Sequence, residues 1–204
     1  MNERLLLNIK DSRLLVKVIN RLKFRSVSFT LQRSGREDIV MTDDPSSIKS
    51  GNLHVVYVTH DNYEGRCELV KLLIRGKLVY NEVRIGIDPG DPHTIAIMGN
   101  GELIEVFRSD NVEQILHKIL LIHKTYPYKN IVIKVGCGGG YEPILKHLCC
   151  NLLGLDNVRV EVVDESGTSR RLVKNVKGLR IAKRDYAAIN IAMKRGVEVD
   201  KKSW

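Results

Sequence analysis

Long hydrophobic runs are absent from this sequence. No stretch approaches the ~18 consecutive apolar residues of a membrane-spanning helix, although 43% of the 204 residues are hydrophobic. The first residues, Met1 to Arg4, also lack the basic stretch, apolar run and cleavage site of a signal peptide. We therefore expect no membrane span and a cytoplasmic protein. Its length allows one large domain or two small ones, each able to bury a core.

Zinc-site spacing is also missing. None of the four cysteines forms a Cys-x-x-Cys pair with a second such pair at zinc-site distance: Cys67, Cys137, Cys149 and Cys150. We expect structural thiols, with a metal or redox role as the alternative. The histidines show no spacing with acids that would indicate a hydrolase triad or a zinc site. The run Gly136 to Gly140 lacks the Gly-Lys-Ser/Thr ending of a triphosphate-binding loop. It is either a flexible connection or a place where backbone N–H groups approach a phosphate.

Positive charge is concentrated near the end of the sequence. The formal net charge is +9, and residues 170–204 hold eleven basic residues against three acidic ones, a balance of +8. Such a concentration is typical of a surface that binds a polyanion, although a solvated charged surface is the alternative. We predict nucleic-acid contacts from seven residues: Arg170, Arg171, Lys174, Lys177, Arg180, Lys183 and Arg184.

Residues 1–78 have the pattern of a small α/β domain of unknown role. An apolar run at Leu5 to Ile9 precedes a helical pattern that Asp11 or Ser12 caps. Further strands are expected at Ser26 to Leu31, Asp38 to Met41 and Leu53 to Thr59, before a helix at Gly65 to Ile74. Strands that alternate with helices predict a mostly parallel sheet with helical crossovers.

Residues 79–204 read as a second domain. Three strands follow one another at Val83 to Asp88, Thr94 to Met98 and Glu102 to Phe107, and an Asn-Gly turn joins the last two. A helix, the strand Ile131 to Val135, another helix, a strand at Val158 to Val162 and a helix at Ile181 to Arg195 come next. This β-β-β-α-β-α-β-α order resembles the RNase H-like topology, an α/β fold in which helices flank a mixed five-stranded sheet.

Acidic residues stand out at three places in the second domain. Asp88 ends the first strand and shares its face with Gly86, which would leave room beside it. Asp164 and Glu165 follow the fifth strand, at the sheet edge where α/β proteins bind ligands. Asp185 lies on the apolar stripe of the last helix. A buried carboxylate needs a metal ion, a salt bridge or a proton, so Asp185 either joins a metal site or pairs with a basic residue.

Three short motifs carry a family resemblance. The segments IGIDPG (85–90), DESGTS (164–169) and RDYAAINIA (184–192) resemble those of RuvC/YqgF-type RNase H-like nucleases, which include Holliday junction resolvases and enzymes that mature ribosomal RNA precursors. The resemblance implies catalytic roles for Asp88, Glu165 and Asp185. It implies that these residues and Asp164 bind Mg²⁺ or Mn²⁺ for two-metal-ion hydrolysis, with DNA or RNA as substrate, and it leaves a homodimer open.

The sequence also departs from that family at two positions. Lys134 lies in the fourth strand, where RuvC-type resolvases have a glutamate, and Ser166 replaces an arginine that follows the Asp-Glu pair. On the three motifs and their acids, the principal hypothesis is a metal-dependent nuclease. The alternative is a nucleic-acid-binding protein of the same fold without catalysis. A sugar-kinase or actin-like domain is a third candidate, but the chain is short for the two domains that such proteins need.

Overall fold

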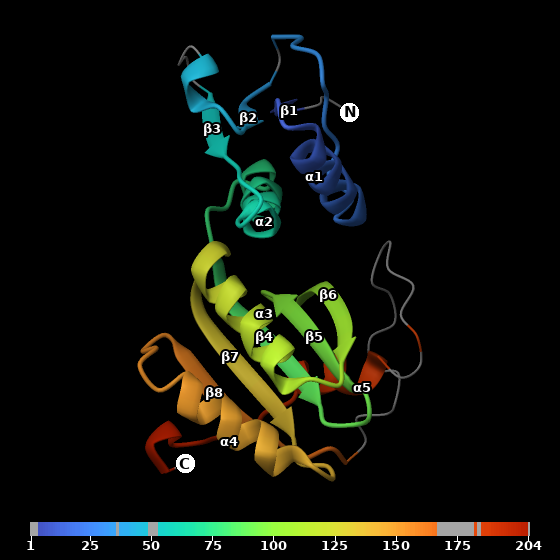
Figure 1. Cartoon of the computed structure of the whole chain (residues 1–204), viewed down its shortest axis with the longest axis vertical. Helices are drawn as coiled ribbons and strands as arrows, with labels where there is room; N and C mark the ends of the chain where they lie inside the picture. Colours follow the sequence, from blue (N-terminus) through green and yellow to red (C-terminus); the bar gives the residue numbers. More distant parts are fainter. Residues whose placement is uncertain (1–3, 36, 49–52, 167–181, 183–184, 204) are drawn as a thin grey trace. The chain divides into compact units, whose positions relative to one another are not determined.

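The computed structural model describes residues 4–35, 37–48, 53–166, 182 and 185–203, and it divides the chain into two compact units (Figure 1). The first unit consists of Met1–Val79 and Lys124–Pro127, and the second of Tyr80–His123 and Tyr128–Trp204. No helix in the described ranges is long and apolar enough to span a membrane.

The first unit is a three-stranded parallel sheet packed against two helices. Its strand order is β1-β2-β3, and every pair is parallel, as the sequence predicts. Asp11 caps the first helix by accepting the N–H groups of Arg13 and Leu14, at 2.8 and 3.0 Å. The elements are β1 (Leu5–Asn8), α1 (Ser12–Phe24), β2 (Ile39–Thr42), η1 (Pro45–Ser47), β3 (His54–Tyr57) and α2 (Tyr63–Ile74).

The strand predicted at Ser26 to Leu31 is wrong. Only Thr30 pairs there, in an isolated parallel bridge to Leu6 of β1. The Thr30 hydroxyl donates to the Gln32 carbonyl at 2.9 Å and accepts the Gln32 N–H at 3.1 Å. This local turn leads the chain away from the sheet, because a threonine hydroxyl that bonds its own backbone competes with strand pairing.

A buried ion pair lies in the core of the first unit. Nε of Arg25 in the segment after α1 lies 2.8 Å from Oε1 of Glu68 in α2, and the two side chains are 3% and 0% exposed. Arg21 of α1 contacts the same carboxylate and donates to the Tyr126 hydroxyl at 3.0 Å. A β-carbon on Gly65 would lie 2.2 Å from the Thr125 carbonyl oxygen. The absence of a side chain at Gly65 therefore lets α2 lie close to Thr125.

The second unit is built on a six-stranded mixed sheet of order β6-β5-β4-β7-β8-β9. Strands β4, β5 and β6 are antiparallel neighbours, while β7 and β8 extend the sheet in parallel from β4. This arrangement is an RNase H-like fold. Its elements are β4 (Tyr80–Asp88), β5 (His93–Gly99), β6 (Glu102–Ser109), α3 (Val112–Thr125), β7 (Tyr128–Gly136), α4 (Tyr141–Asn151), β8 (Val158–Val163), α5 (Asp185–Met193), β9 (Val197–Glu198) and η2 (Lys201–Ser203).

The five predicted strands are present, and β9 adds a sixth. This strand has two residues, which pair antiparallel with Glu161 and Val162 of β8. Two residues are too short for the alternation that identifies a strand in a sequence. The predicted final helix also differs, because the described helix α5 spans Asp185–Met193.

Helices cover both faces of this sheet. Figure 1 shows α3 and α4 across one face and α5 on the other. On the α5 face, a β-carbon on Gly86 would lie 2.2 Å from the Ala188 carbonyl oxygen and 2.5 Å from the Ala192 nitrogen. The room that the sequence predicts beside Asp88 is therefore filled by the α5 backbone. This close contact fixes the helix over the centre of the sheet.

Candidate nuclease site

One row of the sheet has Asp88 at its centre. Arg108 of β6 pairs with Thr94 of β5, and Thr94 pairs with Asp88 of β4. On the other side, continuing the β4–β7 register one residue beyond Ile87 places Gly136 beside Asp88. Paired residues of neighbouring strands point to the same face. The side chains of Arg108, Thr94 and Asp88 therefore lie on the face that α5 covers.

Asp88 is a half-buried carboxyl group at the carboxyl end of the central strand. Burial raises its pKa, although the N–H of Gly90 and the nearby His93 act in the opposite direction. Partial removal from water disfavours the charged form of a carboxyl group. Raised carboxyl pKa values are concentrated at functional sites.

Glu165 lies directly over Gly136. A β-carbon there would be 2.2 Å from Oε1 of Glu165, and the same oxygen accepts the N–H of Gly138 at 3.0 Å. The glycine-rich run therefore holds a carboxylate of its own chain.

Asp164, the neighbouring acid, is exposed. It accepts the N–H of Ser166 at 3.0 Å and the hydroxyl of the same residue. The Ser166 hydroxyl is the main reason that the pKa of Asp164 is lowered. Of the two acids after β8, only Glu165 lies against Gly136.

Asp185 is buried at the start of α5, with 7% of its surface exposed. The sequence predicts this burial from the apolar stripe. Arg108 donates to its Oδ1, and the N–H of Ala182 donates to its Oδ2 at 2.9 Å. The basic partner that the sequence leaves open is therefore Arg108 of β6, which lies 77 residues away in the chain.

The acids that the sequence singles out do not come together as a three-ligand group in this arrangement. Within the described residues, which include Asp88, Asp164, Glu165 and Asp185, no group of three or more His, Cys, Asp or Glu side chains could hold a metal ion. Both oxygens of Asp185 are bound to other donors. The catalytic and metal-binding roles of these residues therefore remain predictions.

Lys134 lies in β7, the predicted fourth strand, and its charged side chain has partners in β8 and just after α5. Its Nζ lies 3.1 Å from Oε2 of Glu161, its register neighbour in β8, and it also donates to the carbonyl of Lys194 just after α5. Only 8% of the Lys134 side chain is exposed. A cation at the C-terminal end of a helix is favourable because the helix dipole is negative there. Lys134 therefore stabilises the docking of α5.

The predicted basic surface falls mainly outside the described part of the chain, since Arg170, Arg171, Lys174, Lys177, Arg180, Lys183 and Arg184 all lie there. Two lysines further along are described and bind backbone carbonyls. Lys194 donates to the Asp164 carbonyl at 2.9 Å. Lys201 donates to the carbonyls of Leu152, Leu155 and Val158 at 2.9 to 3.0 Å, which attaches the C-terminal segment to the end of α4 and the start of β8.

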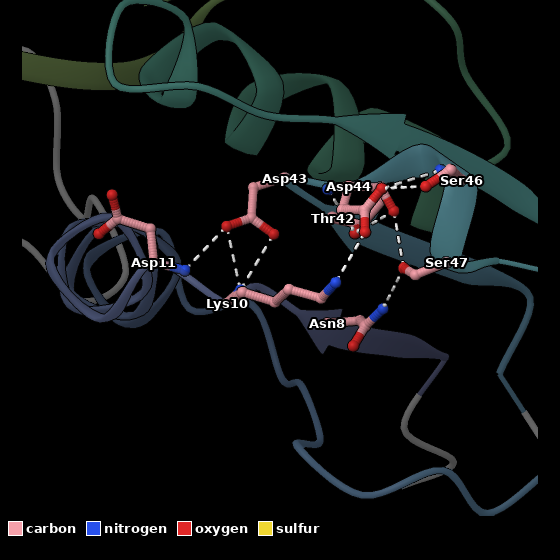
Figure 2. A network of polar contacts seen from close by, with 8 residues as sticks. All are labelled: Asn8, Lys10, Asp11, Thr42, Asp43, Asp44, Ser46 and Ser47. Carbon is pink, nitrogen blue, oxygen red and sulfur yellow. Dashed lines mark hydrogen bonds and ion pairs between the residues drawn. The ribbon is translucent and has the colours of Figure 1, made fainter.

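The first unit has a polar network at the carboxyl edge of its sheet (Figure 2). Asp43 accepts the backbone N–H groups of Lys10 and Asp11 at 3.0 and 2.8 Å, and Lys10 binds Asp44 at 2.7 Å. Burial raises the pKa of Asp43, but these N–H groups outweigh it, so the pKa is lowered overall. The donors are all residues of the same unit, and they tie the loop after β1 to the loop after β2.

Neither a protein-family model nor a curated protein matches this chain. Among solved structures, it is similar to Marinitoga piezophila Argonaute in complex with a 5′-hydroxyl guide RNA, at 13% identity and a TM-score of 0.27. The match covers 79% of this chain and 39% of that one. At this TM-score the likeness supports no conclusion about function, and the resemblance to RuvC/YqgF-type nucleases remains a prediction.

Proposed function

We propose that this protein is a nuclease that hydrolyses phosphodiester bonds in DNA or RNA and depends on Mg²⁺ or Mn²⁺. The observation that carries the proposal is Asp88, a half-buried carboxyl group with a raised pKa at the end of the central strand. Asp88 lies on the sheet face that is covered by α5, the helix of Asp185, and it lies beside Gly136, against which Glu165 packs. Carboxylate oxygens from separate elements are the ligands that these ions prefer.

Two sequence features support the finer assignment to the RuvC/YqgF class. The three motifs occur in the family's order, and each supplies one of the acids Asp88, Glu165 and Asp185. Residues 170–204 carry most of the net charge of +9, which favours a polyanionic substrate. In this proposal, Asp88, Glu165 and Asp185 would hold the metal, which would activate water and stabilise the leaving oxygen.

A second candidate is a nucleic-acid-binding protein of the same fold without catalysis. The ion pair between Arg108 and Asp185 favours it, because this pair withholds one of the three predicted ligands. Lys134 favours it as well, because it is a basic residue in the strand where RuvC-type resolvases have a glutamate. This candidate predicts binding to nucleic acid that does not require a divalent ion and produces no cleavage.

The test is a cleavage assay with single strands, duplexes, four-way DNA junctions and structured RNA, with Mg²⁺, Mn²⁺ or a chelator. We expect Mg²⁺- or Mn²⁺-dependent cleavage of at least one substrate. Asp88→Asn should lower its rate by about a hundredfold or more while binding is retained, because a lost metal ligand removes several kcal/mol of transition-state stabilisation. Asp156→Asn is the matched control, since Asp156 is exposed and precedes β8 at the opposite end of that strand from Glu165.

Equal cleavage by the wild type and Asp88→Asn would contradict the role of Asp88. Binding without cleavage under every condition would favour the second candidate. Binding to either nucleic acid should weaken with added salt, because lysines and arginines release counterions from the phosphates.

A further inference from the structure

We infer that Arg108 competes with a divalent cation for Asp185 and thereby weakens metal binding by the acids of the second unit. This inference rests on the proposed function, because it concerns the same acids. It addresses the disagreement between a predicted three-acid metal site and a structure in which the described acids do not form one.

Arg108 contacts Asp185 from a neighbouring element. Strand β6 lies two strands from β4 in the sheet, and register places Arg108 in the same row as Thr94 and Asp88. The Arg108 side chain is 30% exposed, whereas that of Asp185 is 10% exposed. The guanidinium therefore extends from the surface to a carboxylate that is almost removed from water.

The ion pair satisfies Asp185 without a metal. A buried carboxylate is unstable unless a cation or several hydrogen bonds compensate for its lost hydration. Arg108 supplies the charge at Oδ1, and the Ala182 N–H occupies Oδ2. A divalent ion at Asp185 would have to displace the guanidinium or lie close to it, and like charges at contact distance repel strongly in a partly dry site.

The other acids are bound differently. Glu165 accepts a backbone N–H from Gly138, and Asp88 interacts with the Gly90 N–H and with His93. The N–H groups of Gly90 and Gly138 have no net charge that would repel a cation. The Arg108 guanidinium at Asp185, in contrast, has a full positive charge. Removing the Arg108 charge should therefore increase the affinity of the whole group for a divalent ion.

The experiment is a Mn²⁺ titration of the full chain, in which electron paramagnetic resonance measures the remaining free Mn²⁺. It compares the wild type, Arg108→Gln and Arg84→Gln. Arg84 is a matched control because it forms an ion pair with Glu82 and points to the same face of β4, four residues before Asp88. At about 3.3 Å per residue, it lies on the order of 13 Å from Asp88 along the strand.

We expect Arg108→Gln to bind Mn²⁺ on the order of tenfold more tightly than the wild type, and Arg84→Gln to bind like the wild type. Adding Asp88→Asn to Arg108→Gln should remove the gain. Arg108→Lys provides a second variant in case the glutamine variant does not fold. A lysine cannot form the bidentate contacts of arginine, so its Mn²⁺ affinity should lie between the other two.

Two results would overturn the inference in distinguishable ways. If the wild type binds Mn²⁺ through Asp88 and the Arg108 variants bind no more tightly, Arg108 does not compete, while the proposed function stands. If neither the wild type nor any Arg108 variant binds Mn²⁺, the inference and the metal-dependent function both fail. Binding by Arg108→Gln alone would support the inference and contradict the proposed function.

Discussion

At the residue scale, the three central acids differ in how the protein compensates for their charge. Asp185 has an arginine and a backbone N–H, and Glu165 has the N–H of a glycine. Asp88 is half-buried, and the loss of hydration outweighs its stabilising contacts, so its pKa is raised. A carboxylate that costs stability is typical of a site kept for function.

This difference predicts that Asp88→Asn stabilises the protein at neutral pH. The folded state holds the Asp88 proton more tightly than the unfolded state, whose pKa is near 3.8. Stability therefore falls as pH rises from 3.8 through the higher folded pKa. Urea unfolding should give a higher free energy of unfolding for the variant at pH 7, and no difference below pH 3.8. Lower stability of the variant at pH 7 would contradict this explanation.

At the element scale, the position of α5 depends on a glycine in β4. The backbone of α5 lies against Gly86, with Ala188 and Ala192 at the contact. Both alanines are fully buried. Because α5 carries Asp185 and β4 carries Asp88, this contact also sets the arrangement of the candidate site. At the C-terminal end of α5, Lys134 binds the carbonyl of Lys194.

We expect Gly86→Ala to destabilise the second unit by about 3 kcal/mol, because the added methyl group would overlap backbone atoms that cannot move independently. Chemical denaturation monitored by circular dichroism measures this loss. Gly139→Ala is the control, since a β-carbon at Gly139 has no atom within 4 Å. The packing argument would be refuted if the two substitutions had equal effects.

At the scale of the whole molecule, the chain has two units with separate cores. Their sheets are separate, one of three strands and one of six. The core of the first unit includes the buried pair Arg25 and Glu68. Lys124–Pro127, which covers the end of α3 and the two residues before β7, also belongs to that unit. Removing one partner of a buried ion pair is strongly destabilising, because the other partner is left as an uncompensated buried charge.

Arg25→Met should therefore destabilise the first unit by about 3 kcal/mol and leave the second unit unchanged. Hydrogen exchange followed by mass spectrometry should show faster exchange in peptides from residues 4–79 and 124–127, and not in the β4–β8 sheet. Arg4→Gln is the control, because the pair between Arg4 and Asp38 is about half exposed and contributes little. Faster exchange in both units would show that they unfold together.

Much of the fold could be predicted from local sequence patterns. Alternating apolar residues identified β4, β5, β6 and β8, and an apolar run identified β7. The Asn100-Gly101 turn identified the β5–β6 hairpin. Local patterns were insufficient where strand pairing depends on the adjacent strand in the sheet. Thr30 forms only one bridge, and β9 is too short to show a period.

The sequence by itself determined the order of the elements and the buried position of Asp185, because both follow from the spacing of apolar residues along one strand or helix. Only the tertiary structure decided that Arg108 is the cation at Asp185 and that the Glu165 side chain packs against Gly136. These contacts join residues that are far apart in the chain. They depend on strand register and on the docking of α5, neither of which the local spacing of residues specifies.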